Sequence, residues 1–187
     1  MMKVRKPRRF VRDEGGVAAL EFALIAPTLC LLLAGVADFG GALYTKFKLD
    51  AAVAAGANYA QVNAANVNST SGASLATNIA AIVENAEGSN SANNVIVVNN
   101  GPSVTDSSGS SSSSGTPTSA NSCYCPTGTT TSLTWGGAAT CGSTCAGGGV
   151  AGKFVTVTAT ATYTPIFTSY GLIQNDTITA SATVETQ

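Results

Sequence analysis

A long apolar segment near the N-terminus constrains this chain more than any other feature of its sequence. Residues 17–37 contain Glu21 as the only charged residue and Pro27 as the only strong helix breaker. A helix of this length spans about 30 Å, the thickness of the hydrocarbon core of a bilayer. Six of the nine Lys and Arg residues lie in the first twelve positions, and basic residues beside a span stay in the cytoplasm. The sequence therefore predicts a single-pass membrane protein, with residues 1–16 inside the cell and the chain after residue 37 outside.

The rest of the composition argues against several classes of function. From residue 17 onward, three Lys and no Arg stand against eight carboxylates, so we expect no nucleic-acid partner. The chain has no histidine, which removes the commonest general base and the usual imidazole ligand of zinc. The glycines at 147–149 lack the Lys and Ser/Thr of a phosphate-binding loop. We expect no enzyme, no cofactor, no metal site and no small-molecule substrate.

The carboxylates beyond the membrane segment are scattered through polar stretches of the sequence. This distribution predicts that they are solvated surface groups and that none of them forms a catalytic acid pair. The residues concerned are Glu84, Glu87, Asp106, Asp176 and Glu185.

Glu21 decides between three interpretations of the apolar segment. A cleavable secretory signal peptide needs an uninterrupted apolar core. An uncut membrane anchor also avoids a carboxylate, because a charge at depth costs about 2.5 to 3.5 kcal/mol on insertion scales. The third interpretation gives the acid a function, since an ionisable group inside a membrane usually has a specific partner.

The residues around Glu21 favour the third interpretation. The stretch at 16–22, Gly-Val-Ala-Ala-Leu-Glu-Phe, resembles the processing site of prepilins, where a membrane peptidase cuts after glycine and leaves glutamate as the fifth mature residue. The match is closest to the Tad/Flp branch, in which Tyr or Phe follows the glutamate, as Phe22 does here. With the preceding basic leader, the segment resembles TadE-like proteins, pilin-like components of tight-adherence pilus systems.

The resemblance implies a cut between Gly16 and Val17. Such a cut would create an α-amino group on Val17, and Glu21 lies one helical turn further along the chain. The carboxylate of one subunit can then neutralise the amine of a neighbouring subunit within the lipid. The implied partners are membrane lipid, a prepilin peptidase and other pilin-like subunits.

Helical periodicity continues beyond the membrane segment. An unbroken helix to about residue 65 would be about 70 Å long and would form a stalk over residues 38–65, with bends expected at Pro27 and at the glycines 40 and 41. Its larger apolar residues form one stripe, which either packs on the chain's own head or contacts another subunit. The stripe consists of Val36, Phe39, Leu43, Phe47, Ala51, Ala55, Tyr59 and Val62.

Residues 66–187 are predicted to form an extracytoplasmic α+β head. Residues 75–86 have a helical apolar period, residues 95–98 read as a buried strand, and residues 155–163 and 177–184 alternate between apolar and polar positions as paired strands do. Residues 101–122 are rich in serine and are expected to be a disordered insertion.

Four cysteines lie in a Gly- and Thr-rich loop at 123–145. Four thiolates can bind zinc, but the spacings here differ from zinc-ribbon knuckles, and the expected location is oxidising. We therefore expect two disulfides. A bond within the Cys-x-Cys pair would be strained, so Cys123 or Cys125 should pair with Cys141 or Cys145, while Cys30 stays in the span.

The C-terminal strands at 154–167 and 177–187 also resemble the TadE-like family, although Glu185 stands where the family often has a basic residue. The fold class expected is thus α+β, with a long membrane helix, a stalk and a small pilin-like antiparallel β head. The function expected is pilus assembly in the bacterial cytoplasmic membrane, with the head in the periplasm. The alternative is an uncut, membrane-anchored binding or adhesion module.

Overall fold

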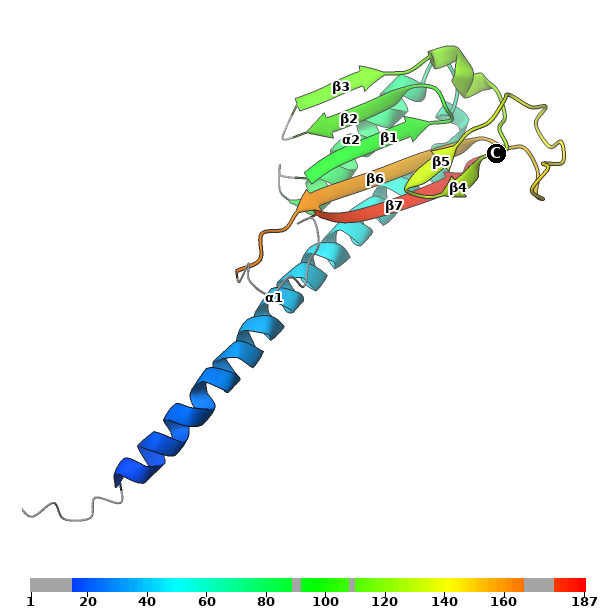
Figure 1. Ribbon diagram of the computed structural model, residues 1–187. Coiled ribbons are helices and arrows are strands. Elements are labelled where there is room, and N and C mark those ends of the chain that lie inside the picture. Colours follow the sequence, from blue (N-terminus) through cyan, green and yellow to red (C-terminus); the bar gives the residue numbers. More distant parts are fainter. Residues whose placement is uncertain (1–14, 89–91, 108–109, 167–176) are drawn as a thin grey trace, which may run out of the picture.

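The computed structural model describes residues 15–88, 92–107, 110–166 and 177–187, and the leader expected at residues 1–16 lies almost wholly outside them. The chain forms one long helix, a second helix and a sheet, joined by short turns and a disulfide loop (Figure 1). The elements are α1 (Gly15–Val62), α2 (Gly72–Glu87), β1 (Ala92–Val98), β2 (Ser103–Ser107), β3 (Ser110–Ser114), β4 (Thr127–Thr129), β5 (Ser132–Thr134), β6 (Phe154–Thr162) and β7 (Thr177–Glu185), with 3-10 turns at Ala64–Asn66 and Pro117–Asn121.

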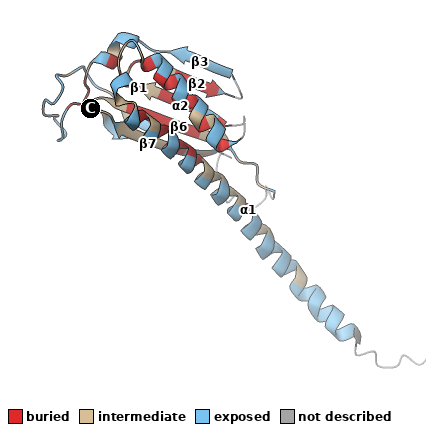
Figure 2. Cartoon of the chain, turned by 180° about the vertical axis from the view of Figure 1, so that it is seen from behind, coloured by how far each residue is buried: buried red, intermediate tan, exposed pale blue. Residues whose placement is uncertain are grey.

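Helix α1 runs without interruption for 48 residues, about 70 Å. It is helical through Pro27 and through the glycines at 40 and 41, where the sequence predicts bends. Its N-terminal half projects away from the head and is almost entirely exposed (Figures 1 and 2). Within the described chain, the stretch from Gly16 to Val62 is the one helix long and apolar enough to cross a membrane.

The five main strands form one antiparallel sheet in the order β3-β2-β1-β6-β7. Strand β6 occupies the position beside β1, with Ile96 opposite Val157, and β7 pairs with its other side, with Ala180 opposite Ala159. The strands expected at 95–98, 155–163 and 177–184 are all present. A long helix followed by an antiparallel β head with two disulfides confirms the expected α+β fold class.

The core lies between one face of this sheet and the two helices (Figure 2). Alternate residues of β6 turn inward, so that Val155, Val157 and Ala159 are fully buried. Gly56 of α1 is needed for this packing, because a Cβ there would lie 2.8 Å from Cγ2 of Val83 on α2. Small side chains on α1 therefore allow the helix to approach both α2 and the sheet.

The serine-rich segment differs from the expected disordered insertion. Strands β2 and β3 form within it, and Asp106 and Ser111 face each other across the pair. Val104 of β2 is buried in the core, which anchors β2 against β1 although its neighbours are polar. Every residue of β3 is exposed, so composition alone carried no signal of a strand there.

Most of the apolar stripe expected on α1 does not pack on the head. The helix face that contacts the core consists of smaller residues on the opposite side, namely Leu49, Ala52, Val53, Gly56, Ala57 and Ala60. Of the stripe, Tyr59 alone reaches the core cluster, whereas Phe39, Phe47 and Val62 are 59%, 65% and 80% exposed. Of the two expected uses of the stripe, packing on the chain's own head is therefore wrong for its members other than Tyr59.

Candidate functional site

The residues predicted to act in processing and assembly lie in the first two turns of α1. Gly16 and Val17 are in the first turn, and Glu21 and Phe22 follow one turn later. All four residues are exposed. The Glu21 carboxylate makes no hydrogen bond or ion pair with any residue that the structure describes. The structure therefore presents an acid, with no partner among the described residues, in the otherwise apolar stretch of α1 at residues 17–37.

Gly16 has no evident role in the fold. A Cβ at this position would meet nothing within 4 Å, and its backbone is not in the left-handed region that favours glycine. Gly35 and Gly40 on the same helix are equally open. The helix itself would be more stable with alanine at Gly16.

Within the described residues, the first polar contact of α1 with the head is at Asp38. This residue is 3% exposed, and its carboxylate oxygen Oδ1 accepts a hydrogen bond from the backbone N–H of Ile166 at 2.7 Å. The hydroxyl of Tyr163 donates to the backbone carbonyl of Asp38 at 2.9 Å. The chain just after β6 is thus held against α1 directly beyond the predicted membrane segment.

A second polar contact joins α1 to the edge strand β7. The ammonium of Lys46 donates to the backbone carbonyl of Thr179 at 2.9 Å and forms a 2.7 Å ion pair with Asp50, one turn along the helix. Together with the core, these bonds hold the part of α1 from Asp38 onward on the head, while the part before it is mostly exposed.

The cysteine loop is closed by two disulfides that cross it. Cys123 is bonded to Cys141 and Cys125 to Cys145, with Cα–Cα distances of 5.0 and 5.7 Å, while Cys30 is free and exposed. The sequence left open two ways of pairing the cysteines across the loop. In the structure the first cysteine of one pair is bonded to the first of the other, and the second to the second. Most of the loop is exposed, apart from Cys123 and Tyr124 at its base.

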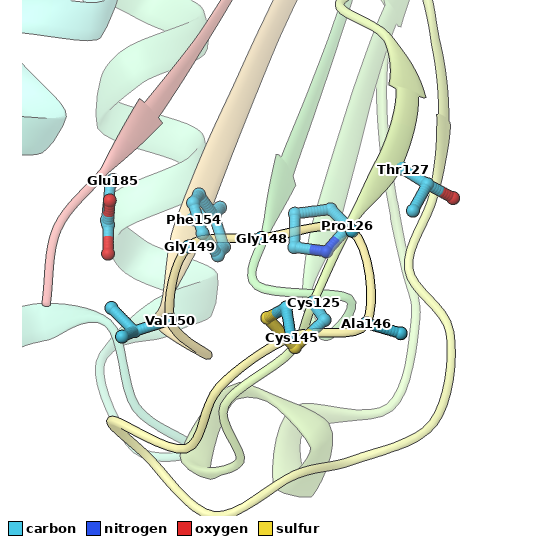
Figure 3. Close-up of a pocket in the computed structure, with 11 residues that line it drawn as sticks. Cys125, Pro126, Thr127, Cys145, Ala146, Gly148, Gly149, Val150, Phe154 and Glu185 are labelled. Carbon is cyan, nitrogen blue, oxygen red and sulfur yellow. A yellow bond between two sulfur atoms is a disulfide. The ribbon is translucent and has the colours of Figure 1, made fainter.

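A pocket lies between this loop and the sheet (Figure 3). Its walls are the Cys125–Cys145 disulfide, the glycines at 147–149 and the ring of Phe154. Glu185 is the one ionisable side chain among the described lining residues. This lining has one carboxylate and no base or nucleophile beside it, so we assign no catalysis to the pocket. Within the described residues, no group of three or more His, Cys, Asp or Glu is placed to hold a metal.

Two carboxylates expected on the surface are buried instead. Glu87 and Asp106 are 5% and 4% exposed, whereas Asp176 lies outside the described residues. Burial raises the pKa of Glu87 to about 7, an effect strengthened by Glu84 and Asp106 and opposed by Asn94 and Lys48. The sequence held a signal for Glu87, because it continues the buried stripe of α2 formed by Leu75, Ile79 and Val83.

Comparison with protein families confirms the resemblance stated from residues 16–22. The family model described as TadE-like protein matches residues 16–58. The match begins at Gly16 and covers most of α1, including Glu21. No curated protein and no solved structure is significantly similar to the chain. The family match and the apolar helix fit a pilin-like component of a Tad pilus that is anchored in a membrane by a single helix.

Proposed function

We propose that this TadE-like chain is a non-enzymatic, pilin-like subunit that acts in assembly of a Tad/Flp-type pilus. It is inserted in the bacterial cytoplasmic membrane with its N-terminus inside and its head in the periplasm. A prepilin peptidase cuts it after Gly16. The observation that carries the proposal is the family match starting at Gly16, on an exposed apolar helix whose acid, Glu21, has no partner within the described chain.

The position of Gly16 supports processing at this site. The Gly16–Val17 bond lies on the exposed part of α1 that projects away from the head (Figure 1), so a protease can reach the backbone without disturbing the head. The fold leaves open space at Gly16, and a glycine that is not required by the fold is explained by recognition. Removal of the leader also discards six of the nine basic residues.

Glu21 then acts as the assembly contact. After cleavage, the new ammonium of Val17 and the carboxylate of Glu21 lie one turn apart on one helix. Between neighbouring subunits with a small axial offset, each amine faces the acid of the next copy. The pair compensates two charges that would each be costly in lipid.

The exposed face of α1 supports contact between subunits beyond the membrane. Asp38, Lys46 and the small residues of the opposite face dock the helix on its own head. This docking leaves the side chains of Val36, Phe39 and Phe47 mostly exposed. We assign this apolar face to neighbouring pilin-like subunits, with which it would continue the helix packing that begins in the membrane.

Substitution of Glu21 tests the assembly contact. The Glu21→Ala variant should insert in the membrane and be cut after Gly16, yet fail to co-purify with its pilus partners. The cost of an uncompensated Val17 ammonium is about 3 to 5 kcal/mol if the site is dry. Cys30→Ala, which also shortens an exposed side chain of the apolar segment, is the matched control and should co-purify normally. Normal complexes with Glu21→Ala would contradict the proposed contact.

A specific observation favours the alternative function, an uncut membrane-anchored binding or adhesion module. The disulfide loop is rigidly closed, mostly exposed and outside the region matched by the family. In this alternative the loop is the binding surface, and Glu21 raises the free energy of membrane insertion without a function. Recovery of the protein with its leader intact, in cells that process other prepilins, would favour it.

A further inference from the structure

A group of buried oxygen atoms without hydrogen-bond donors lies between the C-terminus of α2 and the sheet. Both carboxylate oxygens of Glu87, Oδ1 of Asn94 and Oδ1 of Asp106 are buried and accept no hydrogen bond. The three residues are at most 5% exposed. Buried acceptors without partners are rare in folded proteins and are costly when they are charged.

The strand register brings two of these residues together. Asn94 of β1 and Asp106 of β2 are direct partners across the antiparallel pair. Both lie on the face of the sheet that the helices cover, in line with the buried residues Ile96 and Val104 of their strands. Glu87 is the last residue of α2 and continues its buried stripe. The Asn94 amide lies close enough to favour the charged form of Glu87, but it makes no hydrogen bond of good geometry with it.

Among the described residues, the charges near Glu87 oppose its ionisation with one exception. Glu84 on α2 and Asp106 on β2 both disfavour a second negative charge. The carbonyl groups at the C-terminus of α2 act in the same direction, because that end of a helix carries partial negative charge. Lys48 on α1 is the exception, and it favours the ionised carboxylate.

Lys48 and Glu87 line the same cavity. This space of about 210 Å³ lies at the membrane-proximal end of the head and is bounded by α1, the end of α2, the start of β1 and the end of β6. Its remaining lining is neutral and includes Tyr44, whose ring centroid lies 5.7 Å from the Lys48 ammonium. The cavity therefore gives the Glu87 side chain a second location, which contains the one favourable charge.

We propose that Glu87 is a protonation-dependent contact between α2 and the sheet, which is closed when the carboxyl is neutral and opens into the Lys48 cavity when it ionises. The neutral carboxyl has a proton to donate, and Asn94 Oδ1 and Asp106 Oδ1 are unused acceptors at the site. The ionised carboxylate has nothing to donate and faces Asp106. Its departure toward Lys48 separates the two carboxylates and places opposite charges together.

The pKa of Glu87, about 7 in the closed arrangement, sets the pH range of opening. An opened Glu87 returns toward the ordinary value of about 4.5, so opening should increase about tenfold per pH unit from about 4.5 to 7 and then level off. The closed contact therefore loses strength over the range below neutrality and is weakest from pH 7 upward.

Hydrogen exchange of the full chain in detergent micelles tests the proposal. Protection factors at residues 83–88, which correct for intrinsic exchange rates, should fall about fortyfold between pH 5 and 7. Glu87→Gln, which cannot ionise, should keep constant protection, and the matched Glu84→Gln variant should still show the fall. A wild-type protein with the flat profile of Glu87→Gln would overturn the proposal.

Two further arms test where the carboxylate goes and whether a proton is the ligand. Lys48→Met should reduce the fall in protection several-fold, whereas Lys48→Arg, which keeps the positive charge in the cavity, should not. Equal profiles for the two lysine variants would contradict the movement toward Lys48. Millimolar Ca²⁺ should have no effect. A rise in protection at pH 7 with Ca²⁺, lost in Asp106→Asn, would overturn the proton switch in favour of a cation site.

Discussion

The hydroxyl of Tyr163 donates a 2.9 Å hydrogen bond to the backbone carbonyl of Asp38 and lies directly over Gly41. A Cβ at Gly41 would be 2.5 Å from that hydroxyl oxygen, whereas a Cβ at the neighbouring Gly40 would meet nothing within 4 Å. The hydrogen bond between Tyr163 and Asp38 thus requires a residue without a side chain at position 41, but not at position 40.

Two adjacent glycines allow a matched test of this contact. Gly41→Ala should push the Tyr163 hydroxyl away from Asp38 and lose their hydrogen bond, a cost of about 0.5 to 1.5 kcal/mol that offsets the gain in helix propensity. Gly40→Ala should stabilise the helix by up to about 1 kcal/mol, since alanine is the better helix former. Limited proteolysis of the chain following β6 reports the difference. Equal behaviour of both variants would show that the Tyr163 contact does not hold the head.

The cysteine connectivity gives a second prediction. Mass spectrometry of peptides prepared without reduction should find Cys123 linked to Cys141 and Cys125 linked to Cys145, with Cys30 available to an alkylating reagent. Each bond closes a loop of about 20 residues and should contribute about 3 kcal/mol to the stability of the loop region. Stoichiometric zinc with four reduced thiols would contradict this assignment.

The buried Glu87 predicts how stability depends on pH. Its pKa is about 7 in the folded protein and about 4.5 when solvated, so the folded state binds the proton more tightly. The stabilisation is complete below about pH 4.5 and is lost as the pH rises to about 7, with a total of about 3 kcal/mol. Chemical denaturation at several pH values measures it. The free energy of unfolding of Glu87→Gln at each pH gives the contribution of the other titrating groups. If the wild-type value minus this contribution stays constant or rises with pH over this range, the burial of a neutral carboxyl is contradicted.

The sequence predicted those parts of the fold in which side-chain pattern and structure coincide. The Thr alternation in β6 and β7 required one buried face, and the structure places Val155 and Val157 on it. The apolar segment after the basic residues required a long exposed helix. The first prediction rests on periodicity and the second on the length of an apolar run, and both can be read from consecutive residues without knowledge of distant contacts.

Other features depended on contacts between distant residues and were not predicted. Strand β3 is a row of exposed serines whose only reason to be extended is its pairing with β2. The packing face of α1 is marked by alanine and glycine, because the helix needs close approach, while its larger apolar residues remain exposed. Asp106 was assigned to the surface because its burial results from a strand that composition did not reveal.

The N-terminal sequence of the protein extracted from membranes tests the central claim most directly. Processing as a pilin-like subunit predicts that the mature chain begins at Val17, with the leader and its six basic residues removed. A bulky residue in place of Gly16 should leave only the full-length precursor, whereas the same change at Gly35, which is equally open in the fold, should leave cleavage intact. A wild-type chain that begins at Met1, in cells with an active prepilin peptidase, would contradict the account.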